Sequence, residues 1–79
     1  MDKKQKKKSL EEMIEVVLFR IPKEIEAMRF YKSAAEKATD EAAKELFENL
    51  AAQEKGHEAE LRRILNDLKN QLNELKKEE

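Results

Sequence analysis

Apolar residues recur along the first half of the chain at alternating spacings of four and three. They occupy Leu10, Ile14, Val17, Ile21, Met28, Tyr31, Ala35 and Ala38. The second half repeats the pattern at Ala43, Phe47, Leu50, Leu61, Ile64 and Leu68, and Leu65, Leu72 and Leu75 continue it. A period near 3.6 residues places such positions on one face of an α-helix, as an apolar stripe. The pattern therefore predicts an all-α protein with two helices, at about 9–38 and about 40–76.

One break separates the two predicted helices. The segment KATDEA offers Thr39 or Asp40 as the cap of the second helix, and Glu41 suits its first turn. A connection this short makes the helices antiparallel neighbours, which defines a helical hairpin. Pro22 lies inside the first helix, where its ring removes a hydrogen bond and clashes with the carbonyl of Leu18. We expect a kink or a break there, into pieces at about 9–20 and about 23–38.

Size and composition narrow the ways in which this chain can be stable. Its 79 residues form one small domain with a thin core, which usually needs a disulfide, a metal or a partner chain. It contains no cysteine, which excludes disulfides and zinc-finger patterns. The 17 Lys and Arg residues nearly balance the 18 Asp and Glu residues, so no overall charge favours nucleic acid. A metal held by Glu and His, a partner chain, or both are the remaining options.

Lysines crowd the first residues, MDKKQKKKS. Residues 1–8 are expected to form a disordered, solubilising tail, and the alternative is a tail that binds nucleic acid or an anionic membrane. The segment that follows contains Glu11, Glu12 and Glu15, unlike the apolar core of a signal peptide. No apolar run approaches the ~18–20 residues of a membrane span. We expect a cytoplasmic protein with no nucleic-acid or membrane partner.

Three ionisable residues interrupt the apolar stripes. Glu24 stands between Ile21 and Met28 in the first helix, and Glu54 and His57 stand between Leu50 and Leu61 in the second. Glu24 lies about 15 residues before the turn, and Glu54 and His57 lie about 15 and about 18 residues after it, so all three meet at nearly the same height of an antiparallel hairpin. Because buried charges are paired or bound to a metal, the three residues predict a metal site.

The segment EIEAMRFYKSAAEKATDEAAKELFENLAAQEKGHEAEL resembles one half of a ferritin-like di-iron carboxylate protein, as in rubrerythrins and encapsulated ferritins. These families carry a Glu seven residues before a Tyr in one helix and Glu-x-x-His in the next, as Glu24, Tyr31, Glu54 and His57 do here. Rubrerythrins have two such halves in one chain, often with a Cys-rich module. The single half found here is more similar to encapsulated ferritins, whose site forms between two chains. The resemblance implies a hairpin that dimerises into a ferritin-like four-helix bundle.

The chemistry of the donor groups agrees with this resemblance. Carboxylates and imidazole suit iron or manganese, and a Glu on each of two helices with Glu-x-x-His on the other two holds two metals. One chain offers three such groups, whereas a two-fold dimer offers four carboxylates and two imidazoles. We therefore expect two Fe ions per dimer site, with Mn or Zn as substitutes. The expected activity is that of a ferroxidase, which oxidises Fe(II) to Fe(III) with oxygen or peroxide.

Two residues near the expected site have open roles. Tyr31 is the candidate catalytic residue, through a hydrogen bond to a ligand carboxylate, and the alternative is an ordinary core tyrosine. Gly56 costs about 1 kcal/mol against Ala in a helix, which suits either a close helix contact or a neutral surface position.

Other functions and assemblies stay open as well. One alternative is a metal-free helical dimerisation module, and another is a rubrerythrin-like protein that removes peroxide. The segment MIEVVLFRI, residues 13–21, is apolar on more than one face. Exposed apolar surface of this kind usually marks a contact, so we expect a homo-oligomer larger than the dimer.

Overall fold

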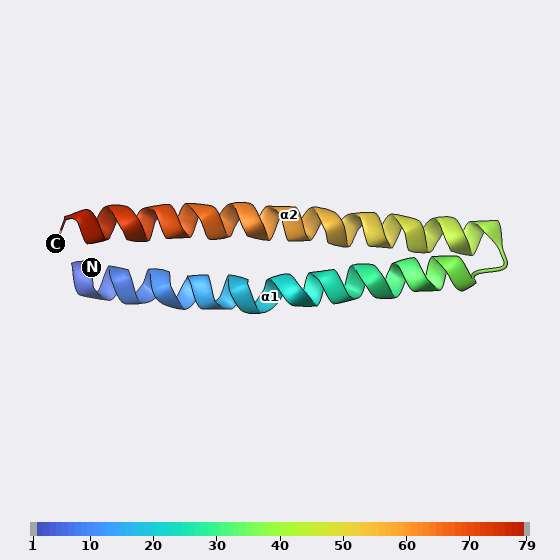
Figure 1. The fold of residues 1–79 in the computed structure, drawn as a ribbon, viewed down its shortest axis with the longest axis horizontal. Coiled ribbons are helices and arrows are strands. Elements are labelled where there is room, and N and C mark those ends of the chain that lie inside the picture. The colour runs from blue at the N-terminus through green and yellow to red at the C-terminus, as the bar shows by residue number, and fades with distance from the viewer. Residues whose placement is uncertain (1, 79) are drawn as a thin grey trace.

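The protein is a helical hairpin. In the computed structural model, which describes residues 2–78, helix α1 spans Lys3–Lys37 and helix α2 spans Glu41–Lys77. Figure 1 shows the two helices lying side by side and antiparallel, with both termini at one end and the turn at the other. The principal extents are 59 × 16 × 14 Å, which describe a rod. The predicted all-α hairpin is confirmed.

The turn lies where the sequence places it. Helix α1 ends at Lys37 with Ala38 as its cap residue, and Asp40 caps α2 by accepting a hydrogen bond from the Ala42 backbone N–H at 3.4 Å. Of the two predicted caps, Asp40 is therefore the one used. Glu41 in the first turn of α2 and Lys37 in the last turn of α1 both complement the helix dipoles.

The start of α1 corrects the expectation of a disordered tail over residues 1–8. The helix begins at Lys3, not near Ser9, and Met1 lies outside the described residues. Asp2 caps this end by accepting a hydrogen bond from the Gln5 backbone N–H at 2.8 Å. Lysine is a good helix former, and the final turns of α2 run alongside, with Lys3 Nζ 3.6 Å from a Glu78 carboxylate oxygen. A cap, helix propensity and a neighbouring helix together extend α1 by two turns.

Pro22 does not split the first helix in two. Helix α1 is continuous from Lys3 to Lys37 with Pro22 inside it, so the expected pieces 9–20 and 23–38 are a single element. Ile21 and Glu24 on either side of the proline are both buried against α2. Pro22 is exposed, and so is Leu18, whose carbonyl loses its hydrogen-bond donor to the proline. Packing on both flanks outweighs the local cost of the proline.

The core is thin and lies mainly toward the chain ends. Five buried apolar side chains form one cluster there, Leu10, Val17, Ile21, Leu68 and Leu75. Among residues 2–78 no large side chain is less than 2% exposed. Seven large apolar residues are instead exposed, Met13, Val16, Leu18, Phe19, Phe30, Leu46 and Ile64. A single hairpin thus leaves much of its apolar surface in water. Neither helix contains a stretch both long and apolar enough to cross a membrane.

Candidate metal centre

Glu24, Glu54 and His57 meet in the middle of the hairpin. Glu24 comes from α1, whereas Glu54 and His57 are one turn apart on α2 and point from the same side of it. The His57 Nδ1 atom lies 3.6 Å from Glu24 Oε2 and 3.5 Å from Glu54 Oε2. The predicted convergence of these three side chains is therefore present within one chain.

The two helices keep the same register seven residues nearer the turn. Tyr31 of α1 stacks on Phe47 of α2 with ring centroids 6.5 Å apart. Tyr31 and Glu24 are seven residues apart on α1, and Phe47 and Glu54 are seven apart on α2, so both contacts belong to one antiparallel register. The packing of the aromatic pair fixes the height at which the carboxylates face each other.

The three side chains differ in their exposure to solvent. Glu24 is 5% exposed and is the one charged residue in the range 2–78 that is buried. The side chain of Glu54 is 19% exposed and that of His57 is 61% exposed. The cluster thus has a closed end at Glu24 and an open end at the imidazole, which a metal ion can reach from solvent.

The two carboxyl groups change each other's acidity. The hydrogen bond with Glu54 and the neighbouring Arg20 hold the pKa of Glu24 below its ordinary value, although desolvation opposes this. The same contact with Glu24, together with desolvation, raises the pKa of Glu54. A single proton shared by the pair therefore belongs to Glu54. Two carboxylates brought together in this way favour the arrival of a cation, which can replace the proton.

The geometry fits a metal ion. One oxygen or nitrogen from each of the three residues can be chosen so that all lie within 4.8 Å of one another. Two ligands at about 2.1 Å from one ion stand at most about 4.2 Å apart, so small side-chain adjustments suffice. Two carboxylates and one imidazole form a donor set that iron, manganese and zinc accept.

Arg20 is part of this cluster, and the sequence reasoning missed it. Its Nε–H donates a hydrogen bond of 2.7 Å to Glu24 Oε1 from one turn earlier on α1. The available signal was an arginine four residues before a glutamate on the apolar stripe, a spacing at which side chains meet.

Tyr31 lies beside the aromatic residues of the hairpin. Besides stacking on Phe47, it makes an edge-to-face contact with Phe30 at 5.7 Å between ring centroids. A residue seven positions along a helix is about 10 Å away along its axis, so the Tyr31 ring belongs to the layer next to Glu24. The described part of the chain contains no hydrogen bond from the Tyr31 hydroxyl to Glu24, Glu54 or His57. The catalytic role of Tyr31 stays a prediction.

Arg20 and His57 border the same open side of the hairpin. A shallow pocket of about 220 Å³ is lined by Arg20, Glu24, His57, Glu60 and Leu61. Residues seven apart lie on the same side of a helix. Met13 therefore lies on the same side of α1 as Arg20, and Ile64 lies on the same side of α2 as His57. We call this side of the hairpin, with Met13, Arg20, His57 and Ile64, the site face.

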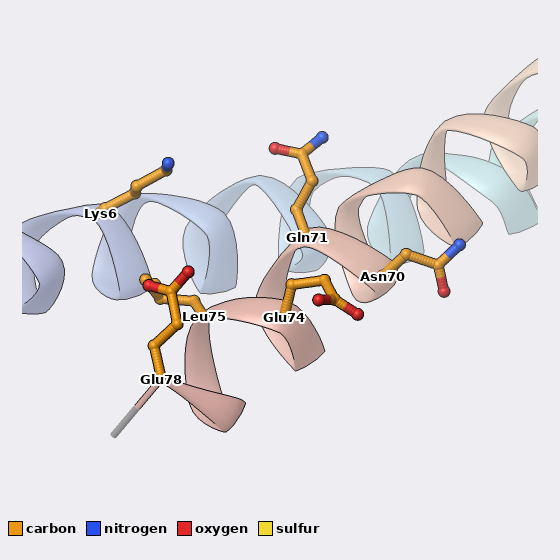
Figure 2. Close-up of a pocket in the computed structure, with 6 residues that line it drawn as sticks. All are labelled: Lys6, Asn70, Gln71, Glu74, Leu75 and Glu78. Atoms are coloured by element: carbon orange, nitrogen blue, oxygen red, sulfur yellow. The ribbon is translucent and has the colours of Figure 1, made fainter.

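A second hollow lies at the end of the rod where the termini meet. It measures about 300 Å³ and is lined by Lys6, Asn70, Gln71, Glu74, Leu75 and Glu78. Figure 2 shows Lys6 and Gln71 projecting away from the ribbon there. Its carboxylates are exposed surface groups paired with lysines, Glu74 with Lys77 at 3.3 Å and Glu78 with Lys3 at 3.6 Å. It contains no imidazole and no buried carboxylate, so the mid-hairpin cluster is the candidate metal centre.

A hairpin that carries Glu on one helix and Glu-x-x-His on the other is the half-bundle unit of ferritin-like carboxylate proteins. The family model for rubrerythrin matches residues 15–79, which is most of the chain. The chain therefore belongs to the rubrerythrin family, whose members typically bind iron. Comparison with curated proteins and with solved structures gave no match.

Proposed function

We propose that the protein is a ferroxidase that oxidises Fe(II) to Fe(III) at a di-iron site shared by two copies of the chain. The observation that carries this proposal is the cluster of Glu24, Glu54 and His57, with a buried carboxylate at its centre, in a chain of the rubrerythrin family. Each Fe(II) gives up one electron, and oxygen or peroxide accepts the electrons together with protons from water.

The number of donor groups supports a shared site. Three donor groups are too few to hold two ions, and two hairpins related by a two-fold axis through the site face bring six. The site face also carries exposed apolar side chains on both helices, including Met13 and Ile64. Covering them with a second hairpin would complete a four-helix bundle and bury apolar surface that one chain leaves wet.

Each ligand residue has its own task in this proposal. Glu24 would hold metal from the closed end of the cluster, because its carboxylate is buried. Glu54 and His57 would each hold one ion from the side, and the exposed imidazole marks the solvent side of the site. Bound iron supplies the one-electron chemistry, and the protein supplies negative charge and fixed geometry. Metal binding should oppose the raised pKa of Glu54, because a cation beside the carboxyl group favours its ionised form.

Peroxide removal is the second candidate, and membership of the rubrerythrin family favours it. It would use the same ligands but requires a reductant to return the iron to Fe(II). The two functions are distinguished by the product, because a ferroxidase accumulates Fe(III) whereas a peroxidase consumes reductant and peroxide continuously.

The test is iron oxidation by matched variants. The parent protein should bind about one Fe per chain, or two per four-helix bundle, and should oxidise added Fe(II) in air faster than buffer does. Glu54→Ala and His57→Ala should reduce the rate to that of buffer while helix content is kept. Glu58→Ala is the control, because Glu58 lies on the same helix with a side chain 21% exposed, against 19% for Glu54. Equal rates for Glu54→Ala and the parent would show that the site is elsewhere.

Assembly should follow metal binding. If the site lies between chains, removing metal raises the dimer dissociation constant, and sedimentation with and without metal measures this. A monomer that binds two ions tightly would contradict a shared site. Met13, Val16 and Phe19 are exposed and lie off the stripe of Ile14, Val17 and Ile21, so we further propose a second contact and an oligomer above the dimer. Light scattering that shows only a dimer at high concentration would contradict this last proposal.

A further inference from the structure

Arg20 holds one of the two oxygens of the central carboxylate. Its Nε–H donates to Glu24 Oε1 at 2.7 Å, while Glu24 Oε2 faces His57 Nδ1 at 3.6 Å. Within residues 2–78, Arg20 is the one permanently charged cation that pairs with Glu24. Because Glu24 is 5% exposed, this arginine is a principal partner of a carboxylate that water reaches poorly.

This pairing conflicts with metal binding. A metal ion at the cluster would draw on the negative charge of Glu24, and one of the two oxygens of this carboxylate is bonded to Arg20. A guanidinium next to a divalent cation is also repelled by it. Arg20 and a metal ion therefore compete for the negative charge of the same carboxylate.

We propose that Arg20 is a positioning residue which holds the Glu24 carboxylate in place when no metal is bound, and releases it when a cation arrives. This inference rests on the proposed metal site and adds to it a built-in competitor. In this role Arg20 lowers the affinity for metal and raises the stability of the metal-free protein.

The surroundings of Arg20 allow such an exchange. Its side chain is 57% exposed, so it can leave Glu24 without crossing the core. It also lines the shallow pocket of about 220 Å³ on the site face, which gives the guanidinium space beside Glu24. A long, flexible arginine side chain can reach solvent from this position while its methylene groups stay against the helix.

The chain contains a matched control. Arg62 Nε–H donates to Glu58 Oε2 at 2.8 Å, also over four residues, and the Arg62 side chain is 57% exposed as well. This pair differs from Arg20–Glu24 in that its carboxylate does not belong to the metal cluster. Any general effect of removing a surface arginine should therefore appear equally in Arg62→Leu.

The experiment compares Arg20→Leu, Arg62→Leu and the parent protein. Co(II) affinity is measured without oxygen at slightly alkaline pH, and melting temperatures are measured with Co(II) and with chelator. We expect Arg20→Leu to bind Co(II) about tenfold more tightly, which corresponds to about 1.4 kcal/mol. We expect the same variant to melt lower with chelator and to show a larger rise on adding Co(II). Arg62→Leu should match the parent in affinity.

Two further variants separate charge from folding effects. Arg20→Gln removes the charge but keeps a polar side chain, and it should tighten Co(II) binding even if Arg20→Leu folds poorly. Arg20→Lys keeps the charge and should stay near the parent affinity. Weaker Co(II) binding by Arg20→Gln, or equal affinities for the Arg20 and Arg62 variants, would overturn the inference. A parent protein that binds no Co(II) or Fe(II) would overturn the proposed function itself, and the inference with it.

Discussion

Two regions of the same helix pair are held together by opposite chemistry. Toward the chain ends α1 and α2 meet through Leu10, Val17, Ile21, Leu68 and Leu75. At mid-height the same apolar stripe carries Glu24 against Glu54 and His57, with Arg20 beside them. The leucine region stabilises the hairpin by removing apolar surface from water. The mid-hairpin region brings together carboxylates that repel one another unless a proton, an arginine or a metal ion compensates them. Stability and candidate function thus occupy separate segments of one interface.

Truncating a leucine in the apolar region should have the largest effect on stability. Leu68 is 9% exposed and belongs to the core cluster, so Leu68→Ala should lower the free energy of unfolding by about 2–5 kcal/mol. Urea unfolding of the metal-free protein, followed by helical circular dichroism, measures the loss. Leu18→Ala is the control, because Leu18 is 48% exposed and should change the value by no more than about 0.5 kcal/mol. Similar losses for the two variants would show that Leu18 is buried in an assembly.

Neutralising the carboxylates should raise the stability of the metal-free protein, in contrast to truncating a core leucine. Replacing both Glu24 and Glu54 by Gln removes their mutual repulsion and the need for a shared proton, so the metal-free protein should melt at a higher temperature than the parent. The same change removes two ligands per chain, so adding Fe(II) or Co(II) should no longer raise the melting temperature. Calorimetry with and without metal measures both effects. A metal-free double variant less stable than the parent would mean that the carboxylates are net stabilising.

The pH dependence of stability should report the carboxyl pair. The pKa of Glu54 is raised in the folded protein, so its contribution to stability is present at low pH and is lost as pH rises through that raised pKa. The pKa of Glu24 is lowered, so its contribution is present above its ordinary value and is lost as pH falls through the lowered pKa. Denaturant titrations of the metal-free protein should show the loss on the alkaline side of the ordinary range, and Glu54→Gln should abolish it. A loss of the same size in Glu54→Gln would assign it to another group.

Gly56 offers the smallest expected effect. A Cβ added there meets nothing within 4 Å, and the residue lies inside α2. Gly56→Ala should therefore stabilise the isolated hairpin by about 0.5–1 kcal/mol, through helix propensity alone. If the variant is stabilised but loses metal-linked association, Gly56 serves a close contact between chains. If both stability and association are unharmed, Gly56 is a neutral surface residue. The comparison is made by thermal unfolding and sedimentation.

Much of the fold could be read from spacing alone. The alternation of four and three predicted both helices, and the short KATDEA segment predicted the antiparallel turn, which the structure confirms with Asp40 as the cap. The distances of Glu24, Glu54 and His57 from the turn predicted that they would meet, because an antiparallel hairpin with a fixed rise per residue leaves one register once the turn is located. Local rules of helix geometry suffice for each of these results.

Other features depended on contacts between the helices. The lysine-rich start was expected to be disordered, yet α1 begins at Lys3, because α2 extends far enough to run beside it and Asp2 caps it. Pro22 was expected to kink or break α1, yet burial of its neighbours keeps the helix in one piece. Helix propensity alone cannot predict where α1 begins or whether it continues through Pro22, since both depend on how much of α1 the partner helix covers.

The sequence by itself determined which residues form the candidate metal cluster, because helical periodicity and the position of one turn decide which side chains share a height and a face. Only the tertiary structure decided how these residues differ from one another. It buries Glu24 and leaves the His57 side chain 61% exposed, and it places the Arg20 guanidinium on Glu24 Oε1. Exposure and pairing depend on the exact approach of two helices and on side-chain conformation, which a pattern of apolar positions does not contain. Those two properties set the charge balance that a metal ion meets at this site.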